Sequence, residues 1–239
     1  MYKRQVATIA DWFWEFGDGG TSVQQNATHV YVAPGMYFVT LTVTDTAGCT
    51  NSITKPVAIV AQPTANFSYS QPACRLSAIQ FTDQSLAPVG YIVRWEWDFG
   101  DGNTQIVNFP TNPDLSHIYA NYGTFNAQLT IITNDSCEQF IIIPVVVSPN
   151  PLSNFSFLTS CVGSPVQFND LSQPGAGGIT GWLWNFGDPP SGANNTALIE
   201  DPTHIFSGAG TFNVSLSVTN TGGCQDPVIK GVRVLALPV

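Results

Sequence analysis

An eight-residue phrase occurs three times in this chain, as WFWEFGDG at 12–19, WEWDFGDG at 95–102 and WLWNFGDP at 182–189. Its central aspartates, Asp18, Asp101 and Asp188, lie 83 and 87 residues apart. That period is far too long for one turn of a solenoid and suits a small all-β domain. The sequence therefore predicts an array of three modules of one kind.

The same further elements follow each phrase. A histidine comes first, then a glycine, and then a stretch in which every second residue is apolar, at 37–43, 125–131 and 212–218. This alternation is typical of a half-buried antiparallel strand. A cysteine closes every copy.

Proline-bearing stretches divide the chain into module 1 (residues 1–61), module 2 (62–149) and module 3 (150–239). Because the links are short, we expect the modules to stand end to end as a rod roughly 100 Å long. Modules 2 and 3 open with two strand-like runs, at 67–85 and 155–172, that have no counterpart in module 1. Module 1 is expected to lack its first two strands, which either missing sequence or a partner chain would supply.

Charge and hydropathy exclude several classes of function. Lys and Arg number only 7 against 16 Asp and Glu, and no basic stripe exists that could bind a nucleic acid. The longest apolar run, 140–147, is too short to span a membrane and is predicted to be a strand. Charged residues make up 10% of the chain, a composition that favours an extracellular β-protein.

The cysteines lie in two recurring positions. Cys74 and Cys137 are 63 residues apart, and so are Cys161 and Cys224. Equal spacing predicts one disulfide within module 2 and one within module 3, since small extracellular domains favour such bonds. The alternative is buried free thiols. Cys49 occupies the position of Cys137 and Cys224 but has no partner in module 1, so it is predicted to be unpaired.

All six tryptophans belong to the three phrases, at alternate strand positions that face one way: Trp12, Trp14, Trp95, Trp97, Trp182 and Trp184. One hypothesis is an aromatic platform that stacks on sugar rings. The favoured hypothesis is the core of a β-sandwich, because the tryptophans obey strand alternation in every copy. Each histidine is likewise predicted to be a packed residue that bonds loop carbonyls.

The G-D-G that ends the phrase predicts a hairpin turn in which Asp18, Asp101 and Asp188 bond nearby backbone amides. Module 3 has prolines after Asp188, so its loop is predicted to be longer. A calcium site using Asp98 and Asp101 is the alternative, but calcium needs six or more oxygen ligands and the chain lacks the D-x-D-x-D-G pattern. We therefore expect no cofactor. Catalytic motifs are also lacking, and the sequence predicts that the chain is not an enzyme.

The combination W-x-W-x-FGDG, H-x-Y and G-x-Y/F-x-V-x-L-x-V resembles the PKD (polycystic kidney disease) domain over essentially the whole chain. The resemblance implies tandem immunoglobulin-like β-sandwiches, an all-β fold, no catalytic residues and an extracellular or cell-surface location. The cysteine positions resemble those of arrays in large surface proteins of gliding bacteria. Implied partners are neighbouring modules of one long polypeptide or like subunits, and surface glycans or a matrix protein.

Two functions stay open. In the first, the chain is a structural or adhesive segment of a large cell-surface protein or filament. In the second, it is an accessory region of a secreted protease or polysaccharide hydrolase. The number of tandem modules and their short links favour the first.

Overall fold

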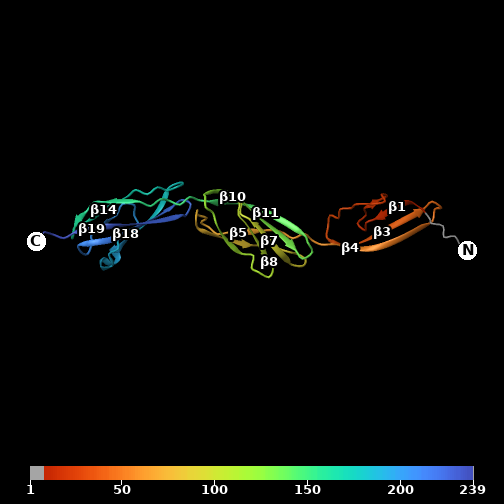
Figure 1. The fold of residues 1–239 in the computed structure, drawn as a ribbon, viewed down its shortest axis with the longest axis horizontal. Coiled ribbons are helices and arrows are strands. Elements are labelled where there is room, and N and C mark those ends of the chain that lie inside the picture. The colour runs from red at the N-terminus through yellow and green to blue at the C-terminus, as the bar shows by residue number, and fades with distance from the viewer. Residues whose placement is uncertain (1–7, 239) are drawn as a thin grey trace.

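The computed structural model of the protein describes residues 8–238. Its three modules follow one another along a single long axis, with the chain termini at opposite ends (Figure 1). Almost all regular structure is β-strand, as the repeats predict. The rod is therefore built from β-sheets whose order along the axis is their order in the sequence.

Module 2 is a sandwich of two antiparallel sheets. The three-stranded sheet has the order β5-β6-β9, with β5 (Phe67–Tyr69), β6 (Ala78–Asp83) and β9 (Leu115–Ile118). The four-stranded sheet has the order β11-β10-β7-β8, with β7 (Ile92–Asp98), β8 (Thr104–Asn108), β10 (Gly123–Thr133) and β11 (Glu138–Val147). The tryptophan phrase forms β7 and the turn to β8.

Module 3 repeats this architecture. Its smaller sheet has the order β12-β14-β17, with β12 (Phe155–Phe157), β14 (Val166–Asp170) and β17 (Thr203–His204). Its larger sheet has the order β13-β19-β18-β15-β16, with β13 (Ser160–Cys161), β15 (Ile179–Asn185), β16 (Thr196–Ala197), β18 (Gly210–Asn220) and β19 (Gln225–Leu235). A 3₁₀ helix, η1 (Pro189–Asn195), lengthens the turn after Asp188.

Module 1 has only the larger of the two sheets among its described residues, 8–61. The sheet has the order β2-β1-β3-β4, with β1 (Ile9–Glu15), β2 (Thr21–Ser22), β3 (Gly35–Asp45) and β4 (Thr50–Ile59). It corresponds to the β7-β8-β10-β11 sheet of module 2. The face that would close a sandwich core is uncovered.

Strand alternation places the core between the two sheets of modules 2 and 3. In module 2, Trp97 pairs with Leu129 across β7 and β10, and in module 3 Trp184 pairs with Leu216 in the same register. All four side chains are almost completely buried. Burying a leucine or tryptophan in this way stabilises a domain by roughly 2–3 kcal/mol per side chain.

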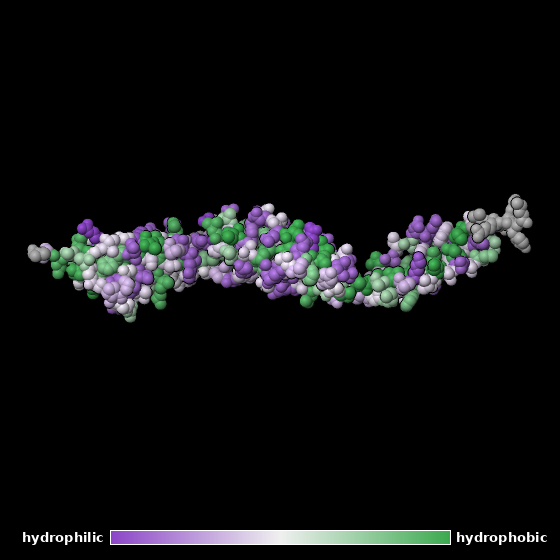
Figure 2. All heavy atoms as spheres, turned by 60° about the horizontal axis from the view of Figure 1, so that its bottom comes forward, coloured by the Kyte–Doolittle hydropathy of each residue, from purple (hydrophilic) through white to green (hydrophobic). Residues whose placement is uncertain are grey.

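The outer surface of the rod carries apolar and polar side chains in small patches over all three modules (Figure 2). Among the described residues, no helix has the length and apolarity that crossing a membrane would require.

Candidate functional site

The tryptophans of the repeated phrase belong to the cores of modules 2 and 3. Trp95, Trp97 and Trp184 are buried, and Trp182 is half-buried and packs against the module 3 core. In module 1, Trp12 and Trp14 are only half-buried because no second sheet from residues 8–61 lies over them. The arrangement is that of sandwich-core residues, and Trp97 and Trp184 have no ring face left for a sugar.

A ladder of aromatic rings continues from each tryptophan into the next loop. In module 2, Phe99 stacks on His117 at 3.9 Å, and His117 meets Tyr119 edge-on at 4.6 Å. Tyr119 is fully buried and its hydroxyl donates to the carbonyl oxygen of Phe99 at 3.0 Å. Burial raises the pKa of that hydroxyl, so it stays protonated and keeps its donor role.

The same ladder occurs in the other two modules with one substitution. Tyr31 donates to the carbonyl oxygen of Phe16 at 3.0 Å in module 1. Module 3 has Phe206 instead, which packs but cannot donate. The hydroxyl and the amide of the following residue, Ser207, donate to Asp188. The sequence predicts the loss of the tyrosine hydroxyl at Phe206 but does not reveal that Ser207 bonds Asp188 beside it.

Each histidine bonds the aspartate of the G-D-G turn. The Nε2 to Oδ2 distances are 2.7 Å for His29 and Asp18, 2.8 Å for His117 and Asp101, and 3.1 Å for His204 and Asp188. The predicted packing of the histidines is found, since each ring stacks on the phenylalanine of its phrase. The predicted partner, a loop carbonyl, is wrong, because Nε2 of each histidine bonds an aspartate carboxylate. The predicted hydrogen bonds between the aspartates and turn amides are found at Asp18 and Asp101, which accept from the backbone amides of Gly20 and Asn103.

The pKa of Asp101 is set by two opposing effects. Burial raises it, but the hydrogen bonds from His117 and from Asn103 lower it by more, so the net pKa lies below its ordinary value. The pKa of Asp188 is also lowered overall, because donation from Ser207 and His204 outweighs its burial. The aspartates are therefore held in the charged form that accepts these bonds.

This aspartate–histidine pair does not have the arrangement of a catalytic triad. In a triad the imidazole lies between a nucleophile and a carboxylate. In module 3 the carboxylate of Asp188 lies between Ser207 and His204, so the histidine cannot take the serine proton. His204 is also 3% exposed, which keeps a substrate away from it. The pair ties the turn to β9 in module 2, to β17 in module 3 and to the loop that contains His29 in module 1.

The first glycine of each G-D turn allows two backbones to approach closely. Gly100 has φ +74°, and a Cβ there would lie 2.7 Å from the carbonyl oxygen of Asn126 on β10. Gly17 and Gly187 meet their neighbouring strands in the same way. Only glycine combines positive φ with this contact. Close packing of the turn on the sheet therefore requires glycine at this position.

Asp98 and Asp101, the candidates for calcium, bond the amides of their own turn, since Asp98 accepts from Gly100 and Asp101 from Asn103. Within residues 8–238, no group of three or more acidic, histidine or cysteine side chains has a geometry suited to a metal ion.

The disulfide of the structure joins two modules. Cys74 of module 2 is bonded to Cys224 of module 3, with their Cα atoms 5.7 Å apart, whereas Cys49, Cys137 and Cys161 are free thiols. The predicted pairs, Cys74 with Cys137 and Cys161 with Cys224, are therefore wrong. The unpaired state of Cys49 agrees with the prediction.

Strand register explains why the predicted pairing within module 2 fails. Cys137 lies in the turn between β10 and β11, next to the pair of Ile132 with Glu138. Cys74 forms a bridge with Ser148, just beyond the opposite end of β11. A strand of ten residues is about 33 Å long, and a disulfide requires Cα atoms within about 7 Å. The two cysteines of one module thus lie at its two ends.

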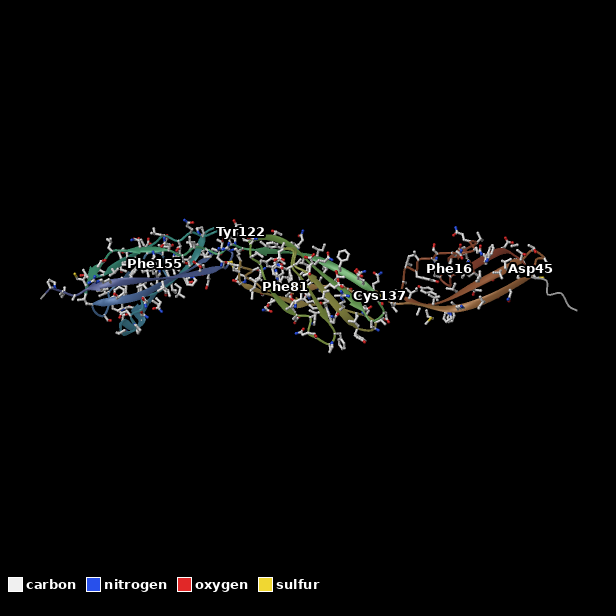
Figure 3. All side chains as sticks on the ribbon, viewed as in Figure 1. Phe16, Asp45, Phe81, Tyr122, Cys137 and Phe155 are labelled. Carbon is white, nitrogen blue, oxygen red and sulfur yellow. A yellow bond between two sulfur atoms is a disulfide. The ribbon has the colours of Figure 1, made fainter. Side chains whose placement is uncertain are left out.

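The junction of modules 2 and 3 is held by several contacts in addition to the disulfide. The side-chain amide nitrogen of Asn220, Nδ2, donates to the carbonyl oxygen of Pro149 in the link, at 2.9 Å. The turn that contains Gly223 and the fully buried Cys224 lies against Pro72 and Ser148. At the junction of modules 1 and 2, Gln139 donates to Gln62 at 2.9 Å. Figure 3 shows Cys137 at the end of module 2 that faces module 1.

The profile of the PKD domain family matches residues 3–61, 60–143 and 150–234, and the chain belongs to this family. It is 47% identical over 53 residues to a microbial collagenase of Vibrio alginolyticus, covering 22% of this chain and 6% of that protein. It is 36% identical over 69 residues to collagenase ColA of Bacillus cereus, covering 29% of this chain and 7% of that protein. The chain thus spans less than a tenth of these curated relatives.

Among solved structures, the PKD1 domain of the metalloprotease PrtV from Vibrio cholerae is 26% identical. The alignment covers 36% of this chain and 98% of that domain, with a TM-score of 0.32. The matched length is that of one module. The family profile matches each of the three modules, so the chain is a tandem of PKD domains.

Proposed function

We propose that the chain is a non-catalytic structural and adhesive segment of a larger extracellular cell-surface protein or filament, in which serial β-sandwiches form a stalk and present an interaction surface. The observation that carries this proposal is the disulfide between Cys74 and Cys224. This bond restrains the orientation of module 3 relative to module 2, which is a structural role.

Two covalent connections restrain the junction of modules 2 and 3. One is the backbone from Ser148 to Leu152, and the other is the disulfide. A single proline-containing link allows bending about itself, whereas two separate connections remove most of that freedom. Asn220 adds a hydrogen bond to the link itself. These restraints suit a segment whose task is to hold its ends apart.

The low content of charged residues and the disulfide support an extracellular location, because disulfides persist in oxidising compartments.

Small-angle X-ray scattering of the oxidised chain and of the Cys224→Ala variant tests the stalk. The oxidised chain should scatter as a rod with a maximum dimension of roughly 100 Å or more and a narrow distance distribution. The variant should show a broader distribution, with bending at the junction of modules 2 and 3. Equal and broad distributions for both proteins would contradict the proposal.

The second candidate is an accessory region of a secreted protease or polysaccharide hydrolase, and it is favoured by the names of the matched relatives, which include collagenases. Module 2 offers an exposed aromatic pair for such a role, Tyr91 and Phe109, with ring centroids 5.2 Å apart. Aromatic side chains are the usual stacking partners of sugars and of proline-rich surfaces.

Sedimentation with insoluble collagen and with insoluble polysaccharides separates the two functions. Retention of the chain that is lost in a Tyr91→Ala, Phe109→Ala double variant would support the accessory role. No retention above an inert β-sandwich protein of similar net charge would support the stalk. Circular dichroism of the double variant should match that of the parent, because both side chains lie outside the core.

A further inference from the structure

Module 1 exposes the face of its sheet that would form half of a sandwich core. Six side chains line a shallow hollow of about 290 Å³ on this face: Trp14, Val39, Leu41, Ile53, Lys55 and Val57. Leu41 is half-buried, whereas the corresponding Leu129 and Leu216 are 0% exposed. This face is the apolar surface that the described part of module 1 leaves without a cover.

Modules 2 and 3 show what covers the same face. Two phenylalanines from the first two strands pack on the central tryptophan. Phe67 and Phe81 lie 5.2 and 5.8 Å from Trp97, between ring centroids. Phe155 and Phe168 lie 5.1 and 5.4 Å from Trp184. Trp14 occupies the position of Trp97 and Trp184, so two phenylalanines are the groups that would fill its open side.

The second of these two strands, β6 or β14, ends at an aspartate that accepts a hydrogen bond from the first tryptophan of the phrase. Trp95 donates through Nε1 to Asp83 at 2.9 Å, and Trp182 donates to Asp170 at 2.7 Å. Trp12 occupies the position of these two tryptophans in module 1. A cover for module 1 should therefore bring a carboxylate as well as two phenylalanines.

The thiol of Cys137 is a second and independent feature, at the end of module 2 that faces module 1 (Figure 3). Cys137 and Cys224 lie in the same turn of their modules, since the carbonyl oxygen of each accepts the amide four residues earlier, of Thr133 or Asn220, at 3.0 Å. Cys224 is bonded to the cysteine of the module before it. The module before module 2 is module 1, whose described residues, 8–61, include no hairpin of the β5–β6 type and no cysteine at the position of Cys74.

We propose that the open face of module 1 and the thiol of Cys137 form one docking site, and that its occupant is a two-stranded β-segment of the β5–β6 type that carries a cysteine between its strands. This segment precedes β1 as β6 precedes β7, with a connection like residues 84–91 between them. The segment brings two phenylalanines to Trp14, a carboxylate to Trp12 and a cysteine to Cys137.

Modules 2 and 3 show where the cysteine lies in such a segment. Cys74 lies seven residues before Phe81, and Cys161 lies seven residues before Phe168. Strand pairing places both cysteines in parallel next to the last strand of their module, Cys74 opposite Ser148 and Cys161 opposite Leu235. The corresponding position in module 1 is beside Val60, at the junction with module 2.

Closing the bond is an oxidation. The two thiols give up two protons and two electrons to a small-molecule disulfide such as oxidised glutathione, and one sulfur–sulfur bond forms while that of the oxidant breaks. The oxidant leaves as two thiols. The partner cysteine and Cys137 meet without backbone movement if the junction matches that of modules 2 and 3, where the Cα atoms are 5.7 Å apart.

The chain itself provides the sequence for a test. Residues 62–90, placed directly before Thr8, continue into β1 in the same register as they continue into β7, because Trp12 and Trp95 occupy the same position of the repeat. The grafted chain is refolded with reduced and oxidised glutathione and digested without reduction. We expect a disulfide between the grafted copy of Cys74 and Cys137, and free thiols at Cys49 and Cys161. Fluorescence quenching of Trp12 and Trp14 by acrylamide should fall.

Two matched variants of the grafted chain keep the proposal falsifiable. Phe81→Asp in the grafted copy keeps the cysteine but should abolish both the bond to Cys137 and the protection of the tryptophans, while native Phe81 maintains module 2. Cys137→Ala should leave the tryptophans protected and the grafted thiol free. The proposal is overturned if the graft leaves both tryptophans open to quencher, if its cysteine bonds Cys49 or Cys161 as often as Cys137, or if the ungrafted chain already protects both tryptophans as a dimer.

Discussion

Removal of the inter-module disulfide should destabilise module 3 more than any other cysteine substitution in the chain. Cys74 and Cys224 are 150 residues apart, and closing a loop of that length in the unfolded chain corresponds to about 5 kcal/mol in the chain-entropy model. If module 3 unfolds while module 2 stays folded, the loop runs from Ser148 to Cys224, about 75 residues, and the value is about 4.5 kcal/mol.

These values are ceilings, and native disulfides typically contribute about 2–4 kcal/mol. For a module of this size, 1 kcal/mol shifts the melting temperature by about 4–8 °C. The Cys74→Ala, Cys224→Ala double variant should therefore melt roughly 10–30 °C lower in its module 3 transition. Calorimetry without reductant measures this shift, and the parent chain treated with dithiothreitol should reproduce it.

Cys137→Ala and Cys161→Ala are the matched controls, because both residues are free thiols in the structure. Each should shift the melting transition by only a few degrees, since only a partly exposed side chain is truncated. A loss at Cys137 or Cys161 as large as that at Cys224 would show that the bonds close within modules, and the reasoning from strand register would be refuted.

Four further predictions concern the repeat itself. Gly100→Ala should destabilise module 2 by about 2 kcal/mol or more in urea unfolding, because the added Cβ meets the backbone of Asn126. Gly102 also has positive φ but lies in open space, so Gly102→Ala should destabilise the module by only about 1 kcal/mol. Equal losses of stability would contradict the close-packing argument. Phe81→Ala should lower stability by about 3–5 kcal/mol, whereas Phe140→Ala, 59% exposed, should change it by less than about 1 kcal/mol in the same assay. Folding lowers the pKa of Asp101, so the stabilisation of module 2 by its carboxylate is complete above the ordinary carboxyl pKa of about 4 and is lost as the pH falls through the lower folded-state pKa. The free energy of unfolding of Asp101→Asn, measured between pH 2 and 6, should therefore depend less on pH than that of the parent or of Glu138→Gln. An unchanged pH dependence would exclude this coupling. Finally, a second copy of residues 152–238 placed after Pro238 should bond Cys161 to the turn cysteine of the added copy in non-reducing peptide maps, and a thiol that stays free there would limit the inter-module bond to modules 2 and 3.

Much of the fold follows from local sequence pattern. The three phrases and the alternating runs recur in every module, and each predicts a strand that the structure contains. Face alternation alone assigns Trp97 and Trp184 to the core. The proline pair after Asp188 predicts the altered turn, which the structure shows as η1.

The cysteine pairing could not be predicted in the same way, because equal spacing within modules is equally consistent with bonds between them. The distance that decides it depends on which end of the sandwich each turn occupies, and strand register sets that distance. Cys49 does not decide between the two schemes, because it stays unpaired in both.

The histidine partners show a different limit. Sequence separation does not place His117 near Asp101, 16 residues away, because the intervening segment includes β8 and a long connection to β9. The turn amides and the ring stack bring them together. A recurrent aspartate and a recurrent histidine at a constant offset are the signal that could have indicated the pair.

The sulfur–sulfur bond between modules 2 and 3 also decides how the chain responds to a force applied at its two ends. Tension would pass along the backbone to Cys74, cross the disulfide to Cys224 and continue through the last strand. The segment between the two cysteines, which are 150 residues apart in sequence, would carry none of it. Fully extended, a segment of that length would span about 500 Å. While the bond is intact, that length is withheld, and modules 2 and 3 cannot be drawn out as a thread. Under the same tension a reducing medium would release it, so the extensibility of this segment is set by the redox state around it.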